Sequence, residues 1–141
     1  MNYKILVVDD DLTIRSLLKK VLKGEGHAVV SAMSGEEGVE LAEKESPDLA
    51  LLDIELPGID GIETLKQIIK LDPDIAAIMI TAEGSIQTAV AAMKAGARNY
   101  IAKPFNTDEL RLLISETLET VRLRREVQIL RTAQIEKIDF D

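Results

Sequence analysis

Cysteine and tryptophan are absent from this chain of 141 residues, and aromatic side chains make up only 3% of it. Without cysteine there can be no disulfide bond and no thiolate chemistry, which fits a reducing compartment such as the cytoplasm. With so few aromatic side chains, the core has to be built from isoleucine, leucine, valine and alanine. We therefore expect a cytoplasmic protein with an aliphatic core.

Long hydrophobic runs and an excess of positive charge are missing as well. No apolar run approaches the roughly 20 residues that a membrane helix needs, and residues 1–5 lead straight into a strand pattern instead of a signal peptide. The formal net charge of −8 argues against direct binding of this segment to nucleic acid. His27 is the only histidine, and we interpret it as a solvated residue at the start of a strand, not as a metal ligand.

Short apolar runs alternate with helical patterns along the whole chain. The runs lie at residues 4–8, 27–32, 49–53, 75–80 and 100–102. The central run is continuously apolar up to Asp53, which is typical of a strand buried on both faces. The alternation predicts an α/β fold, in which a doubly wound parallel sheet of five strands has the flavodoxin-like order 2-1-3-4-5.

Charged and hydroxyl side chains stand where several of these strands end. They are Asp9, Asp10, Asp53, Thr81 and Lys103. Because parallel strands share one carboxyl edge, where open sheets bind their ligands, we expect these side chains to gather in one crevice. Three carboxylates repel one another unless a cation lies among them. A lysine at the end of a buried strand also needs a carboxylate partner.

Each of these residues has a plainer interpretation when taken alone, because strand-end aspartates and threonines commonly begin loops, and Asp11 is the expected cap of a helix. Together they suggest that carboxylates bind Mg²⁺. An aspartate that lies beside both the metal and a lysine would then attack a phosphoryl group. A nucleotide-binding protein is disfavoured, because acids stand where a phosphate would need glycines and backbone N–H groups. A Mg²⁺-dependent phosphatase with an aspartate nucleophile stays an alternative, with Glu55 as the only approximate substitute for its acid–base aspartate.

In these motifs the sequence resembles the response-regulator receiver domains of bacterial two-component signalling, which are CheY-like. The matching segments lie at residues 7–11, 52–53, 57–58, 60–61, 81–82 and 103–105. The resemblance implies that Asp53 accepts a phosphoryl group from a sensor histidine kinase. It also implies that Asp10 and Asp53 bind Mg²⁺ directly, that Asp9 does so through water, and that the backbone carbonyl of Glu55 completes the ligands.

The resemblance further implies a switch. Lys103 would pair with the phosphoryl group, Thr81 would rotate inward to bond it, and Tyr100 would follow by turning inward. Such a domain is not an enzyme beyond catalysing its own phosphorylation and dephosphorylation at Asp53. We also predict that the acids Glu55 and Glu83 alter the lifetime of phospho-Asp53, and that the Lys103–Pro104 bond is cis.

The last helical pattern continues beyond what such a domain needs, because residues 110–138 contain neither glycine nor proline. Its first half has an inner apolar stripe (Leu113, Ile114, Leu118 and Val121). Leu123, Val127 and Leu130 then follow at heptad spacing, one or two residues out of register with that stripe. We predict a receiver domain at residues 1–121 and a helical linker at residues 122–141 that pairs two copies, with a frayed, solvated tail as the alternative.

Residues 81–90 and 92–97 are similar to NtrC-type receivers, which precede an ATPase in sigma-54-dependent transcription activators. This resemblance implies transcriptional regulation through an output domain that these residues do not contain. A stand-alone receiver that acts by binding a partner on the fourth helix, fifth strand and fifth helix is the other possibility.

Overall fold

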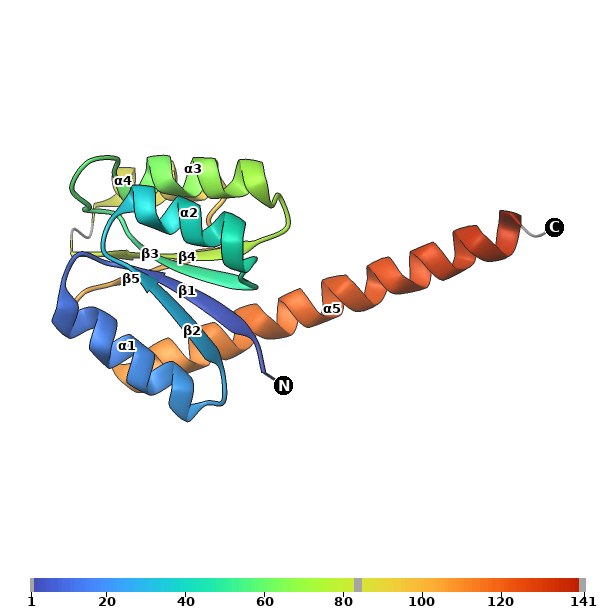
Figure 1. Cartoon of the computed structure of the whole chain (residues 1–141), viewed down its shortest axis with the longest axis horizontal. Helices are drawn as coiled ribbons and strands as arrows, with labels where there is room; N and C mark the ends of the chain where they lie inside the picture. The colour runs from blue at the N-terminus through green and yellow to red at the C-terminus, as the bar shows by residue number, and fades with distance from the viewer. Residues whose placement is uncertain (1, 83–84, 140–141) are drawn as a thin grey trace.

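The computed structural model describes residues 2–82 and 85–139, with side chains described as far as residue 134 (Figure 1). Within these residues, the strands form a five-stranded sheet in the order β2-β1-β3-β4-β5, and every neighbouring pair is parallel. The strands are β1 (Lys4–Val8), β2 (Ala28–Ala32), β3 (Leu49–Asp53), β4 (Ala76–Thr81) and β5 (Asn99–Ala102). The helices are α1 (Leu12–Gly24), α2 (Gly35–Glu45), α3 (Gly61–Leu71), α4 (Ile86–Ala95) and α5 (Thr107–Asp139). The predicted fold and strand order are confirmed.

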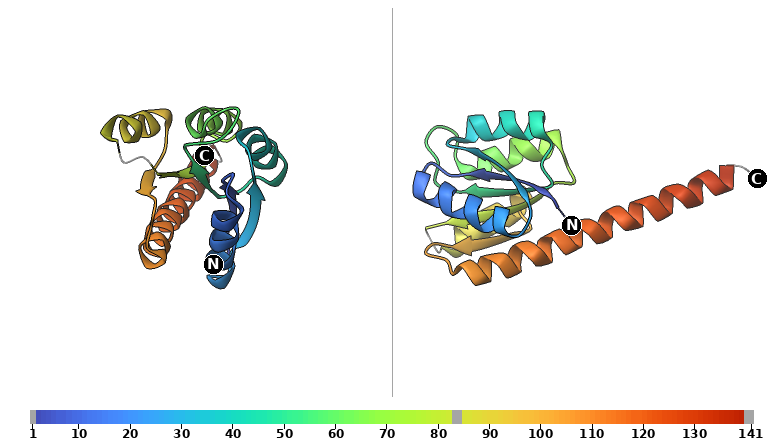
Figure 2. Two further views of the ribbon diagram at one scale, coloured as in Figure 1. Left: turned by 90° about the vertical axis from the view of Figure 1, so that its left-hand side faces the viewer. Right: turned by 60° about the horizontal axis from the view of Figure 1, so that its bottom comes forward.

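Helices cover both faces of the sheet, and this explains why the strands are apolar throughout. Helices α2, α3 and α4 lie on one face, and α1 and α5 lie on the other (Figure 2). Successive residues of a strand point to opposite faces, so Leu51 packs toward α1 and α5 while Leu52 packs toward α2 and α3. All five residues of β3 are buried, as its sequence predicts.

Each of the five described helices begins at a side chain that accepts a hydrogen bond from the first turn, in the usual manner of N-caps. The caps are Asp11 for α1, Ser34 for α2, Asp60 for α3, Ser85 for α4 and Asn106 for α5. Asp11 therefore has the capping role that the sequence predicts, with its Oδ1 accepting from the Thr13 N–H at 2.8 Å. This leaves Asp9 and Asp10 for the crevice.

Strand β2 begins at Ala28, one residue later than the sequence predicts. The reason lies at His27, whose N–H donates to the Leu22 carbonyl at the end of α1 instead of joining the ladder. The His27 side chain is half-buried, and its Nδ1 accepts a hydrogen bond from the Tyr3 N–H at 3.2 Å. His27 is thus a packed residue that ties down the start of β1, not the solvated residue that we expected.

Helix α5 is one continuous helix that leaves the body of the protein (Figure 1). Its first half contributes Ile114, Leu118 and Val121 to the core. At about 100° per residue, the two-residue step from Val121 to Leu123 places the second apolar stripe about 200° further round, on the side opposite the receiver body. None of the helices described here is long and apolar enough to cross a lipid bilayer.

The described part of the second half of α5 has a polar contact with the body. The Arg125 guanidinium lies 2.7 Å from Asp48 Oδ1, and Asp48 Oδ2 accepts from the Lys4 N–H at 2.8 Å. The helix runs unbroken through residue 121, so the boundary that we place there stays a prediction.

Candidate functional site

The register of the sheet brings the predicted side chains together at its carboxyl edge. Val8 is level with Leu52, so Asp9 and Asp53 follow at the same height on adjacent strands. Thr81 is level with Ala102, and the Lys103 N–H donates to the Thr81 carbonyl at 2.7 Å. Strands β1 and β3 are neighbours because the chain reverses its winding direction there, which is where ligand crevices form in such sheets.

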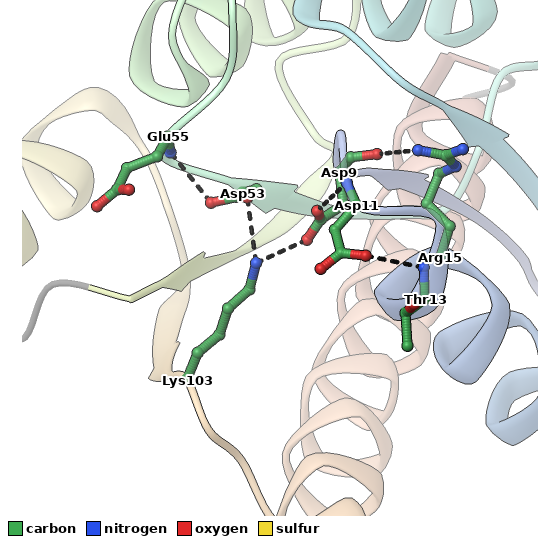
Figure 3. A network of polar contacts seen from close by, with 7 residues as sticks. All are labelled: Asp9, Asp11, Thr13, Arg15, Asp53, Glu55 and Lys103. Carbon is green, nitrogen blue, oxygen red and sulfur yellow. Dashed lines mark hydrogen bonds and ion pairs between the residues drawn. The ribbon is translucent and has the colours of Figure 1, made fainter.

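A lysine bridges the two buried aspartates (Figure 3). Lys103 Nζ lies 2.9 Å from Asp9 Oδ2 and 3.1 Å from Asp53 Oδ2. The other oxygen of each carboxylate accepts a backbone N–H, from Asp11 at 2.9 Å and from Glu55 at 3.0 Å. Asp9 is 0% exposed and Asp53 is 4% exposed, so both carboxylates rely on these partners in place of water. The peptide bond between Lys103 and Pro104 is cis, as predicted.

Three carboxylates are close enough to share one cation. One oxygen from each of Asp9, Asp10 and Asp53 can be chosen so that all three lie within 4.8 Å of one another. Asp10 is exposed, so the cluster opens to solvent on its side. Carboxylate oxygens in a site that water can reach match the ligand preference of Mg²⁺, which retains several of its waters. The residues present therefore fit the predicted metal.

The electrostatics of the crevice favour a charged lysine and a basic aspartate. Burial and the neighbouring charge of Asp9 raise the pKa of Asp53, although the Glu55 N–H and Lys103 act in the opposite direction. Burial alone would lower the pKa of Lys103, but its hydrogen bonds to the two carboxylates outweigh burial and raise it. Lys103 is thus cationic at neutral pH and partly offsets the repulsion between Asp9 and Asp53.

The two residues predicted to switch lie in different surroundings. Thr81 is buried at the end of β4, with 2% of its surface exposed, whereas Tyr100 on β5 is 44% exposed. Tyr100 borders a surface hollow together with Leu112 and Glu116 of α5. Its side chain is therefore on the outside of the protein here, and the inward position stays a prediction for the phosphorylated form. Glu83 lies outside the described residues.

Two side chains support the site without having been predicted from the sequence. Arg15 Nη1 donates to the carbonyl oxygen of Asp9 at 2.7 Å (Figure 3). Glu36 Oε1, at the start of α2, accepts the Ile59 N–H at 2.8 Å and so holds the loop that follows β3. The only sequence signal for Arg15 is its place one helical turn after Asp11, which does not identify its partner.

Comparisons with known proteins agree with this arrangement. Residues 5–115 match the family described as "Response regulator receiver domain". The chain is 42% identical over 118 residues to sporulation initiation phosphotransferase F of Bacillus subtilis, covering 84% of this chain and 95% of that protein. It is 41% identical over 133 residues to the nitrogen assimilation regulatory protein NtrX of Azorhizobium caulinodans, covering 93% of this chain but 29% of that protein.

The crystal structure of NtrX from Brucella abortus superimposes with a TM-score of 0.87 at 41% identity, over 93% of this chain and 30% of the NtrX chain. The chain thus spans less than a third of the length of the NtrX proteins that it matches. The fold, the acidic crevice with its bridging lysine and the match over residues 5–115 lead to one conclusion: this chain belongs to the response regulator receiver domain family.

Proposed function

We propose that this receiver takes a phosphoryl group onto Asp53 from the phosphohistidine of a sensor histidine kinase. The observation that carries the proposal is the pairing of Lys103 Nζ with both Asp9 and Asp53, 2.9 and 3.1 Å away. This pairing places one cation beside the only deeply buried carboxylates of the described chain. A carboxylate, a lysine and room for a cation are the parts that phosphoryl transfer to an aspartate requires.

The transfer needs few protein groups. One carboxylate oxygen of Asp53 attacks phosphorus, a P–O bond forms, and the P–N bond to the histidine breaks with its electron pair returning to the imidazole nitrogen. Lys103 and the hydroxyl of Thr81 would then bond oxygens of the new acyl phosphate. Bound Mg²⁺ would neutralise charge on the phosphoryl oxygens. Its proposed ligands are Asp10 and Asp53 directly, Asp9 through water, and the backbone carbonyl of Glu55.

Incubation of the purified chain with a small acyl phosphate and Mg²⁺ tests this proposal directly. We expect intact-mass spectrometry to find one phosphoryl group per chain, and tandem mass spectrometry to place it on Asp53. Chelation of Mg²⁺ should prevent the reaction, because the crowded negative charges of acyl phosphate and carboxylates then repel each other. Labelling that persists under chelation, or labelling elsewhere, would contradict the assignment. Catalytic turnover of a small phosphoester would favour the Mg²⁺-dependent phosphatase with an aspartate nucleophile instead.

We further propose that residues 122–141 are a linker that pairs two copies of the chain. The linker would transmit the phosphorylation state of Asp53 to an output domain that regulates transcription. The support is the exposed stripe on the side of α5 away from the body, where Leu123, Val127 and Leu130 are 47%, 44% and 61% exposed. Similarity to NtrX, which is named a regulatory protein, favours this output. Similarity to sporulation initiation phosphotransferase F over 95% of its length favours a stand-alone receiver instead.

Charge along the stripe supports a parallel pair. Glu119 and Glu126 flank the stripe on one side, and Arg124 and Arg131 flank it on the other. In a parallel coiled coil each of these glutamates would lie opposite the arginine five residues further along the second copy. In an antiparallel pair glutamate would face glutamate and arginine would face arginine. In the structure of the single chain, Glu119 and Glu126 pair with Arg122 of the same helix, at 2.6 and 3.1 Å. Such exposed ion pairs contribute little stability, so they would not prevent the pairing between two copies.

Replacing Val127 with aspartate should weaken self-association about 10-fold or more, because a charge would enter an apolar seam. Sedimentation velocity over a concentration series, with Mg²⁺ and with or without beryllofluoride as a phosphoryl mimic, measures the effect. Ile129→Asp is the matched control, since Ile129 is 69% exposed but lies on the side of Arg125, away from the seam. Equal effects of the two substitutions would contradict the seam, and a wild-type chain that is monomeric in both states would favour partner binding.

A further inference from the structure

The side chain of Arg15 donates a hydrogen bond to the main chain of the acidic crevice. It lies one turn into α1, is half-buried, and donates from Nη1 to the backbone carbonyl of Asp9 at 2.7 Å (Figure 3). Among the described residues, no carboxylate lies within ion-pair distance of it. Its guanidinium is therefore directed at the main chain of the site, not at the acidic side chains.

Asp9 depends on this contact because the sheet ladder ends there. The Asp9 N–H makes its ladder bond to the Ala32 carbonyl at 3.1 Å, but the chain then turns away toward α1. The Asp9 carbonyl would be left without a ladder partner, and a buried carbonyl without a hydrogen bond is costly. Arg15 supplies the missing donor from the helix that follows.

All four polar groups of Asp9 are thereby held by different parts of the chain. The N–H is bound by β2, the carbonyl by Arg15 of α1, Oδ1 by the Asp11 N–H and Oδ2 by Lys103. Asp10 is the next residue, so the direction of the peptide that Arg15 holds also sets where the Asp10 carboxylate points. Side chains and carbonyls that orient metal ligands in this way strongly affect metal affinity.

Arg15 has two effects on a bound cation, and they have opposite signs. Its positive charge repels a divalent ion in the crevice, so removing the charge alone would tighten binding. Its hydrogen bond holds the turn that carries Asp9 and Asp10, so removing the bond alone would weaken binding. The sign of the change in affinity therefore distinguishes the two roles.

We propose that Arg15 is a positioning residue for the divalent-cation site. Its hydrogen bond to the Asp9 carbonyl fixes the turn between β1 and α1 and so preorganises Asp9 and Asp10 to bind the metal. The inference rests on the proposed function only in taking Mg²⁺ as the cation, and it does not depend on phosphoryl transfer.

Titration of the whole chain with Mg²⁺, followed by backbone amide NMR, tests the proposal. We expect Arg15→Met to weaken Mg²⁺ binding about 10-fold, and Arg15→Lys, which keeps a donor and the charge, to restore much of the loss. Lys19→Met is the matched control: Lys19 is exposed on the same helix, one turn further on, so removing its charge should leave the affinity nearly unchanged.

Other outcomes overturn the proposal. Tighter binding in Arg15→Met would show that the charge dominates, and unchanged affinity with a lower unfolding temperature would show a structural role alone. All affinities are compared at a temperature where every variant is folded. If the wild-type chain itself does not bind Mg²⁺, the proposed function fails as well, whereas normal wild-type binding with no effect of Arg15→Met removes only this inference.

Discussion

Replacing Asp53 with asparagine should abolish phosphoryl incorporation from an acyl phosphate while leaving the protein folded. The amide cannot form the acyl phosphate. Among the described residues, Asp9 is the other buried carboxylate paired with Lys103, and its side chain is only 1% exposed, against 6% for Asp53, so a phosphoryl donor reaches it less easily. Asparagine has nearly the same size as aspartate, so the fully buried β3 should pack as before. Mass spectrometry of the treated variant measures the result.

The same substitution should change how stability depends on pH. Burial, with the charge of Asp9, raises the pKa of Asp53 above its ordinary value of 3.8. The folded state then binds the proton more tightly than the unfolded state, so the ionised Asp53 destabilises the fold. This destabilisation is absent below 3.8, grows as the pH rises from 3.8 through the folded-state pKa, and is constant above it. Asp53→Asn should therefore be more stable than the wild-type chain at neutral pH.

Urea unfolding of both proteins between about pH 3 and pH 7 measures this difference. Asp74→Asn serves as the control, because Asp74 is an exposed acid far from the crevice, and this variant should accept the phosphoryl group normally. A stability difference between wild type and Asp53→Asn that shrinks toward neutral pH would contradict the raised pKa. Phosphoryl incorporation that survives in Asp53→Asn would contradict the identity of the acceptor.

Replacing Gly61 with alanine should unfold or distort the site, at a cost of about 3 kcal/mol in the free energy of unfolding. A Cβ at this position would lie against the carbonyl oxygen of Asp53 and 2.6 Å from the Cα of Ile54. Both neighbours are backbone atoms, so no side-chain rotation can relieve the overlap. The Gly61 N–H also donates to the Ile54 carbonyl at 2.8 Å, which holds the start of α3 against the end of β3.

Urea unfolding measures the loss of stability, and Mg²⁺-dependent phosphorylation measures the loss of function. Gly24→Ala is the matched control, because a Cβ there would meet nothing within 4 Å. That control should leave stability within about 1 kcal/mol of the wild type, or raise it slightly, since alanine restricts the unfolded chain more than glycine does. Similar losses in both variants would contradict the close approach of α3 to β3.

For helix α5, the apolar periodicity of the sequence predicted which residues form a stripe but not the direction in which that stripe faces. The heptad spacing of Leu123, Val127 and Leu130 predicted an apolar stripe, and the structure confirms that these residues are exposed on one continuous helix. Which way the stripe faces depends on how α5 packs, because Val121 is in the core and so sets the rotation of everything after it. The contact between Arg125 and Asp48 joins residues 77 positions apart and has no signal in either segment.

The amino-acid sequence by itself determined the fold class, the strand order and the members of the acidic crevice. The physical reason is that strands joined by helices form right-handed crossovers in a parallel sheet, and parallel strands place their carboxyl ends at a common edge, so Asp9, Asp53 and Lys103 lie at the same edge of the sheet. Only the tertiary structure decided the supporting contacts, such as Arg15 with the Asp9 carbonyl and Glu36 with the Ile59 N–H. Long polar side chains can reach many backbone groups, and which one they bind depends on the final packing of separate helices, not on any local pattern.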